Sequence, residues 1–214
     1  MEDLYRLAQL LQQRTIAEHQ IALQVGQSPS QGEIVEYILR NLLQIAQDSS
    51  MQHDGRFTEG ELAGRLVEIK YFTDGLSLEA LRHALDKPQP DYYLLAVGAS
   101  LAQKQALMCP NALTIEAIYL LNASELASML TSASGKRASE ALLEPFQIYP
   151  EPRNPLICLS EEQRDVLERF SLAELESELR WQRSFETSQD KLEAMAKEAH
   201  QAYLRGETLP LTLE

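Results

Sequence analysis

Residues 65–72 read RLVEIKYF and carry the pattern that decides the fold. In this stretch Leu66, Glu68 and Lys70 alternate with apolar residues at 67, 69 and 71. Side chains of a strand point alternately to its two faces, so the pattern predicts a half-buried strand with Glu68 and Lys70 on one face. Residues 56–58 predict a partner strand, and the Gly- and Glu-containing segment between the two predicts a hairpin.

The segments on both sides of this hairpin predict helices and more strands. Ser30 and Glu33 have the spacing of a capping box and predict the start of a helix that leads into the hairpin. The run DYYLLAV at 91–97 is compact and apolar, which is typical of a buried strand. The remaining predicted elements are a helix over 2–20, a short helix over 77–85, a strand over 114–121, a helix over 122–130, a surface loop over 131–140 and an edge strand over 146–149.

The order of these elements predicts an α/β fold with a mixed sheet flanked by helices. We place a core domain at residues 1–159 and an acidic helical extension at 160–214. Three serines, Ser160, Ser171 and Ser188, are each expected to open a helix in the extension, and Gly206 is expected to end the last one.

Composition limits the classes of function. The chain has 214 residues, 44% of them hydrophobic, and a formal net charge of -13. This negative charge disfavours a surface that binds nucleic acid through many phosphate contacts. It does not exclude a nuclease, because metal sites themselves need carboxylates. No apolar run is long enough to span a membrane, and the start of the chain does not have the pattern of a signal peptide. Cys109 and Cys158 lack metal-type spacing, so we expect free thiols and a cytoplasmic protein.

The ionisable residues around the hairpin follow one another in a recognisable order. Glu33 lies on the preceding helix, Asp54 at the start of the hairpin, and Glu68 and Lys70 on its second strand as E-x-K. This order resembles that of the PD-(D/E)xK nuclease superfamily, and the chain is similar to an uncharacterised bacterial branch of it. The resemblance is best over residues 31–97, with His53 in the place of the motif's proline. It implies the restriction-endonuclease-like fold for the core.

The resemblance also implies a set of roles. Asp54 and Glu68, with the backbone carbonyl of Ile69, would bind Mg²⁺ or Mn²⁺, and Glu33 would complete the site. Lys70 would orient the attacking water and stabilise the charge that develops on the phosphate. The implied activity is metal-dependent hydrolysis of phosphodiester bonds in nucleic acid, with DNA favoured. The alternative is a catalytically inactive nuclease fold that acts as an interaction or regulatory module and binds a protein partner.

Each of these residues also has an ordinary structural interpretation. An E-x-K strand can be a solvated face with an ion pair, and Asp54-Gly55 can be turn chemistry alone. Glu33 can serve only the capping box, in which case Glu36 on the same helix becomes the inward carboxylate. Other motifs are missing: the sequence has no Walker A loop, no zinc-type histidine spacing and no nucleophile elbow.

The acidic extension suggests where a partner would bind. Trp181 and Phe185 lie on an amphipathic stripe of its predicted helices. Such a segment could pack on its own core, pair with a second copy or bind a basic partner. Packing on its own core is the first expectation for this segment. A homodimer formed through the C-terminal helices is the second.

Overall fold

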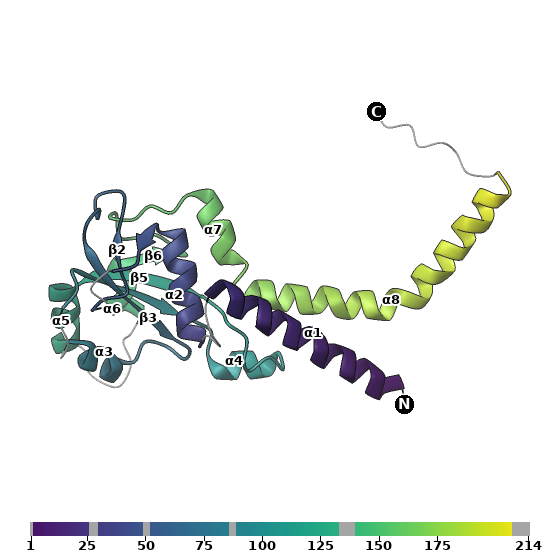
Figure 1. Ribbon diagram of the computed structural model, residues 1–214, viewed down its shortest axis with the longest axis horizontal. Coiled ribbons are helices and arrows are strands. Elements are labelled where there is room, and N and C mark those ends of the chain that lie inside the picture. Colours follow the sequence, from purple (N-terminus) through teal and green to yellow (C-terminus); the bar gives the residue numbers. More distant parts are fainter. Residues whose placement is uncertain (1, 26–29, 49–51, 86–88, 133–139, 207–214) are drawn as a thin grey trace. The chain divides into compact units, whose positions relative to one another are not determined.

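A computed structural model describes residues 2–25, 30–48, 52–85, 89–132 and 140–206 of the chain (Figure 1). By the density of its internal contacts the chain forms two units, residues 1–172 and residues 173–214. The elements are α1 (Glu2–Val25), α2 (Gln31–Leu42), β1 (Ile45–Ala46), β2 (Gly55–Phe57), β3 (Leu66–Phe72), α3 (Leu78–Leu85), β4 (Tyr92–Val97), α4 (Leu101–Ala106), β5 (Ala117–Asn122), α5 (Ala123–Ser132), α6 (Glu140–Leu143), η1 (Glu144–Phe146), β6 (Gln147–Tyr149), α7 (Glu161–Glu168) and α8 (Leu172–Leu204).

The first unit is built on a six-stranded mixed sheet whose strands follow the chain order β1 to β6. Neighbouring strands are antiparallel except β3 and β4, which run parallel. The connection between the parallel strands contains α3, as a parallel pair requires a crossover. The expected α/β architecture with a mixed sheet flanked by helices is therefore confirmed.

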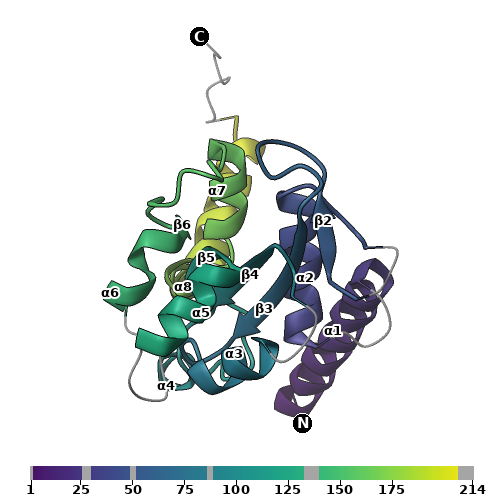
Figure 2. The same ribbon diagram turned by 90° about the vertical axis from the view of Figure 1, so that its left-hand side faces the viewer.

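Each face of the sheet has its own apolar core. On one face Val67 and Ile69 of β3 pack with Val35 and Leu39 of α2. On the other face Leu95 and its neighbours pack with α3, α5 and α6. Figures 1 and 2 show α2 and the pair α3 and α5 on opposite sides of the sheet. The strand alternation read from residues 65–72 thus places Glu68 and Lys70 on the face away from the α2 core.

Capping boxes start the helices where the sequence predicts them. The Ser30 hydroxyl accepts from the Glu33 amide at 3.3 Å, and the Glu33 carboxylate accepts from the Ser30 amide at 2.6 Å. The same reciprocal pairs join Ser160 with Gln163 and Asn122 with Glu125. These bonds satisfy backbone donors that have no partner inside a helix.

Several predicted boundaries need correction. The short strand β1 and the helix α4 were not predicted, and much of the loop expected over 131–140 lies outside the described residues. Ser188 does not open a new helix, because its hydroxyl donates to the carbonyl of Ser184 at 2.6 Å inside the continuous helix α8. Such bonding to the preceding turn is an alternative to a cap for serine. No described helix is long and apolar enough to cross a membrane.

The boundary between core and extension also lies later than residues 159 and 160. Helix α7 belongs to the first unit, because Leu167 is fully buried in the core formed with α2. The Phe170 carbonyl accepts from the Ile115 amide at 2.9 Å, which ties the end of α7 to the strand region. The structural boundary therefore falls after Leu172.

This assignment predicts a large effect for one substitution in α7. Leu167→Ala should lower the free energy of unfolding by about 2–5 kcal/mol, because it removes a buried side chain and leaves a cavity. Val166→Ala is the matched control, since Val166 is 37% exposed and its truncation should change stability by less than about 0.5 kcal/mol. Urea denaturation of both variants checks the prediction, and equal midpoints would mean that α7 is not part of the core.

Candidate functional site

Asp54 directly precedes strand β2, at the point where β3 continues without β2 as its neighbour. Gly55 pairs with Val67, so the next position of β3 facing this edge is Ile69. The Asp54 carboxylate accepts from the Ile69 amide at 2.6 Å and replaces the missing strand partner. The N–H and C=O of one residue in an antiparallel ladder point to the same side. The Ile69 carbonyl therefore faces the edge on which Asp54 lies.

The E-x-K pair on β3 converges with this carboxylate. The Lys70 Nζ lies 2.5 Å from Oε1 of Glu68 and 3.9 Å from Oδ2 of Asp54. The side chains of Glu68 and Asp54 are 15% and 24% exposed, so both charges are partly removed from solvent. Three residues that the sequence places in two separate segments thus form one group, which we call the Asp54 cluster: Asp54, Glu68 and Lys70.

His53 approaches the same cluster. Its Nδ1 lies 3.7 Å from Oε2 of Glu68, and its side chain is only 6% exposed. Its burial follows from its place beside Asp54 at the edge of β3, a contact that spacing along the chain does not reveal.

Helix α2 carries two candidate carboxylates for this site, Glu33 and Glu36, and their surroundings differ. Glu33 is exposed, and its carboxylate accepts from the Ser30 amide, which lowers its pKa. Glu36, one turn later, is half-buried. Burial raises its pKa, the negative charge of Asp54 raises it further, and the positive charge of Lys70 lowers it. The structure therefore does not bring Glu33 to the cluster, because the capping box occupies its side chain. Glu36, the other candidate on this helix, is near enough for the charges of Asp54 and Lys70 to act on it.

Arg40 also belongs to this neighbourhood, and sequence reasoning did not single it out. It lies one turn after Glu36 on α2, and its Nη1 is 3.4 Å from Oε1 of Glu36. Its positive charge also acts on Asp54. Within the described residues its Nε is the buried side-chain nitrogen that lacks a hydrogen-bond partner. The spacing of four residues from Glu36 is the signal that points to it.

Tyr93 was the second residue that the sequence did not indicate. It is the register partner of Glu68 across β3 and β4, and its side chain is buried. Its hydroxyl lies 3.0 Å from Oε1 of Gln89, to which it donates. Burial raises the pKa of Tyr93, and the charge of Glu68 raises it further. Only the strand register brings this residue to Glu68, so no pattern along the chain could have found it.

The carboxyls of Asp54 and Glu36 hold their negative charge at a cost in free energy. Burial raises the pKa of Asp54; the bond from the Ile69 amide opposes this effect, and the charge of Glu68 adds to it. Burial likewise raises the pKa of Glu36, and the charge of Asp54 adds to that effect. The stability that both groups contribute is present below their ordinary pKa values of 3.8 and 4.5 and is lost as pH rises through the raised values. A cation bound nearby would offset this loss.

The donor set of the cluster is chemically suited to a hard divalent cation. Carboxylate oxygens of Asp54 and Glu68 and the carbonyl of Ile69 are oxygen ligands of the kind that Mg²⁺ and Mn²⁺ take. Across the described residues, however, no three His, Cys, Asp or Glu side chains are gathered closely enough to hold a metal as they stand. In the structure the ammonium of Lys70 supplies the positive charge between the two carboxylates.

A cavity of about 770 Å³ lies beside this region, at the carboxyl ends of the parallel strands β3 and β4. Tyr119 and Gln147 line it, and both share a face of the sheet with Lys70 because the register runs from Lys70 through Leu95 to Tyr119 and Gln147. Two strand spacings separate Lys70 from Tyr119, which corresponds to roughly 10 Å. The cavity is thus close to the Asp54 cluster, although none of the three cluster residues lines it.

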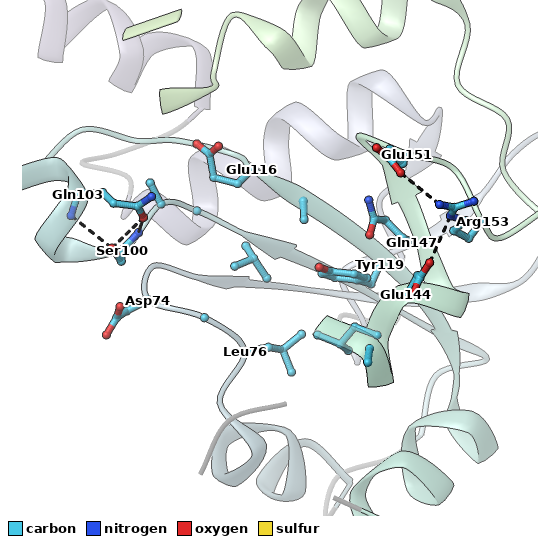
Figure 3. A pocket seen from close by; sticks show the side chains of 17 residues that line it. Asp74, Leu76, Ser100, Gln103, Glu116, Tyr119, Glu144, Gln147, Glu151 and Arg153 are labelled. Atoms are coloured by element: carbon cyan, nitrogen blue, oxygen red, sulfur yellow. Dashed lines mark hydrogen bonds and ion pairs between the residues drawn. The ribbon is translucent and has the colours of Figure 1, made fainter. Parts of the chain in front are cut away.

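The charged residues that line this cavity are mostly acidic, as Figure 3 shows. Among the described residues of the lining the cation is Arg153, which lies between Glu144 at 3.6 Å and Glu151 at 3.2 Å. Asp74 and Glu116 add two further carboxylates. A phosphate would be repelled by this lining, whereas a neutral polar or cationic group would be tolerated. The sequence did not indicate this cavity, because its walls come from several segments that lie far apart along the chain.

A comparison with protein-family models finds none that matches the chain, and a comparison with curated proteins finds no match.

Proposed function

We propose that this chain is a metal-dependent phosphodiesterase of the PD-(D/E)xK type, with a restriction-endonuclease-like core, that cuts nucleic acid and prefers DNA. The observation that carries the proposal is the convergence of Asp54, Glu68 and Lys70 at the edge of β3. A mixed sheet with α2 before the hairpin and with the parallel strand β4 is compatible with such a core. The protein is proposed to act in the cytoplasm.

The charges of the cluster suit phosphodiester hydrolysis. Mg²⁺ or Mn²⁺ would be held by Asp54, Glu68 and the Ile69 carbonyl, and would supply a water of lowered pKa and a clamp on phosphate oxygens. Glu36, in place of Glu33, would add negative charge from α2 to this site. Lys70 would place an ammonium next to the developing charge on the phosphate. The side chains of Asp54, Glu68 and Lys70, which would carry the main roles, lie close to one another.

Binding of the metal alone is the sharpest first test, because it needs no substrate. We expect Mn²⁺ to bind the full-length protein with one set of sites in calorimetry, and Asp54→Asn and Glu68→Gln each to weaken binding by at least about tenfold. Mn²⁺ should also raise the thermal midpoint of the unmodified protein and leave those of the two variants unchanged, since a ligand of the folded state stabilises it.

Two glutamates of α2 provide the matched pair of controls. Glu33→Gln should leave Mn²⁺ affinity unchanged, because Glu33 serves the cap, whereas Glu36→Gln should reduce it. Equal affinities in all four variants and the unmodified protein would contradict a shared carboxylate site. A substrate search with single- and double-stranded DNA and RNA follows only if the site binds metal.

A second function is favoured by the net charge of -13 and the acidic cavity. In this alternative the fold is catalytically inactive and serves as an interaction or regulatory module that binds a basic protein partner. It predicts that Mn²⁺ fails to bind while Asp54→Asn leaves the protein folded. Metal binding that depends on Asp54, together with cleavage of nucleic acid, would exclude it.

A further inference from the structure

Helix α8 carries a continuous heptad repeat that the proposed function does not use. Counting from Trp181, its apolar and small residues are spaced alternately by four and three positions. Such spacing places one seam along a helix and is the pattern of coiled coils. The α8 seam consists of Trp181, Phe185, Ser188, Leu192, Met195, Ala199 and Ala202.

The large residues of the α8 seam are exposed. Trp181 and Met195 are 63% and 65% exposed, and Phe185 and Leu192 are 45% and 44% exposed. The rings of Trp181 and Phe185 stack on each other with centroids 5.4 Å apart, which orders them on the surface of the helix. Apolar side chains aligned in this way along one helix indicate a surface that another helix covers.

In the described part of the second unit, residues 173–206, no other element covers the seam. This unit comprises residues 173–214, and α8 is the helix of its described part. A single helix has no opposite layer against which to bury a stripe, and units of about 40 residues usually need association to become stable. We therefore expect another helix, of similar length and with a similar apolar seam, to cover the α8 seam.

We propose that the α8 seam pairs with the α8 seam of a second copy in an antiparallel coiled coil. In this arrangement Phe185 packs opposite Ala202 of the second copy, so a large residue meets a small one. Leu192 packs opposite Met195, and Ser188 opposite Ala199, which keeps the width of the interface even. Packing of large against small side chains fills an interface without voids.

The charges beside the seam select the antiparallel direction. Lys191 directly precedes the seam residue Leu192, and Glu198 directly precedes the seam residue Ala199. Both charged residues therefore lie on the same flank of the α8 seam. Like flanks face each other in an antiparallel pair, so Lys191 meets Glu198 of the second copy twice. In a parallel pair Lys191 would instead face Ala196, and Glu198 would face Tyr203. Opposite charges meet only in the antiparallel dimer.

Analytical ultracentrifugation of the full-length protein tests this pairing. We expect a dimer at micromolar concentration, and we expect Leu192→Glu to give a monomer, because it would put two charges into the seam. Thr187→Glu is the matched control: it lies on the same exposed helix outside the seam and should leave the dimer intact. A monomeric unmodified protein, or a dimer indifferent to Leu192→Glu, would overturn the proposal.

A charge exchange then tests the direction without disturbing the apolar seam. Lys191→Glu and Glu198→Lys should each raise the dimer dissociation constant by about tenfold, and the double variant should restore it. The two residues are seven positions apart on one helix and so do not face each other within it. A dimer that ignores both single exchanges, or a double variant without recovery, would rule out the antiparallel pairing. Assembly only with a basic protein would also overturn it.

Discussion

Gly55→Ala is expected to lower the free energy of unfolding by about 3 kcal/mol, at the upper end of the usual cost of overpacking. A Cβ atom at this position would lie 2.3 Å from Cγ2 of Ile45 and 2.7 Å from the carbonyl oxygen of Ala46. The second contact is with backbone, so strand β1 as a whole would have to move away from β2. Glycine is required here because the two strands approach closely.

Gly32→Ala is the matched control for this substitution. Gly32 lies on helix α2, where a Cβ would meet only Oγ of Ser30 at 3.7 Å, an ordinary contact. Alanine is favoured over glycine in a helix, so this variant should be about 0.5–1 kcal/mol more stable than the unmodified protein. Guanidinium denaturation measures both changes. A Gly55→Ala variant as stable as the unmodified protein would show that β1 does not pack on β2 as described.

The same substitution links the fold to the candidate site. Gly55 follows Asp54 directly, and Asp54 is held by the Ile69 amide at 2.6 Å. A shift of β2 would move this carboxylate away from β3 and separate it from Lys70. We therefore expect Gly55→Ala to reduce Mn²⁺ affinity even under conditions in which the variant is fully folded.

Lys70→Met is expected to change metal binding and catalysis in opposite directions. The Lys70 ammonium lies 2.5 Å from Glu68 and 3.9 Å from Asp54, where it competes with any cation for the two carboxylates. Its removal should make Mn²⁺ bind more tightly. It should also reduce phosphodiester hydrolysis by about 10²–10³-fold, the usual effect of removing one group that stabilises developing charge.

Two measurements on this variant separate the proposed roles. Calorimetry gives the affinity for Mn²⁺, and single-turnover cleavage gives the rate of the chemical step independently of product release. Lys70→Arg is the comparison that keeps the charge and alters its geometry, and it should fall between methionine and lysine in rate. Unchanged hydrolysis in Lys70→Met would contradict a catalytic role for Lys70, whatever the metal affinity.

Patterns between near neighbours determined much of the secondary structure from the sequence alone. The alternation in residues 65–72 predicted strand β3 and the common face of Glu68 and Lys70, and capping boxes predicted the starts of α2 and α7. These features depend on contacts within about four residues, which the sequence displays directly. The resemblance added the expectation that Asp54 joins Glu68 and Lys70, and the structure brings the three together.

Only the tertiary structure decided which side chains surround this group. The choice of Glu36 over Glu33 depends on the face that α2 turns toward β3, and the place of Tyr93 depends on the register of β4. The short strand β1 has two residues, which pair with β2, and its Ile45 is buried in the core with α2. The acidic cavity likewise collects residues from segments far apart in the chain. Such contacts form only when the sheet is complete, because their energy comes from burial and pairing between distant residues and not from local propensity.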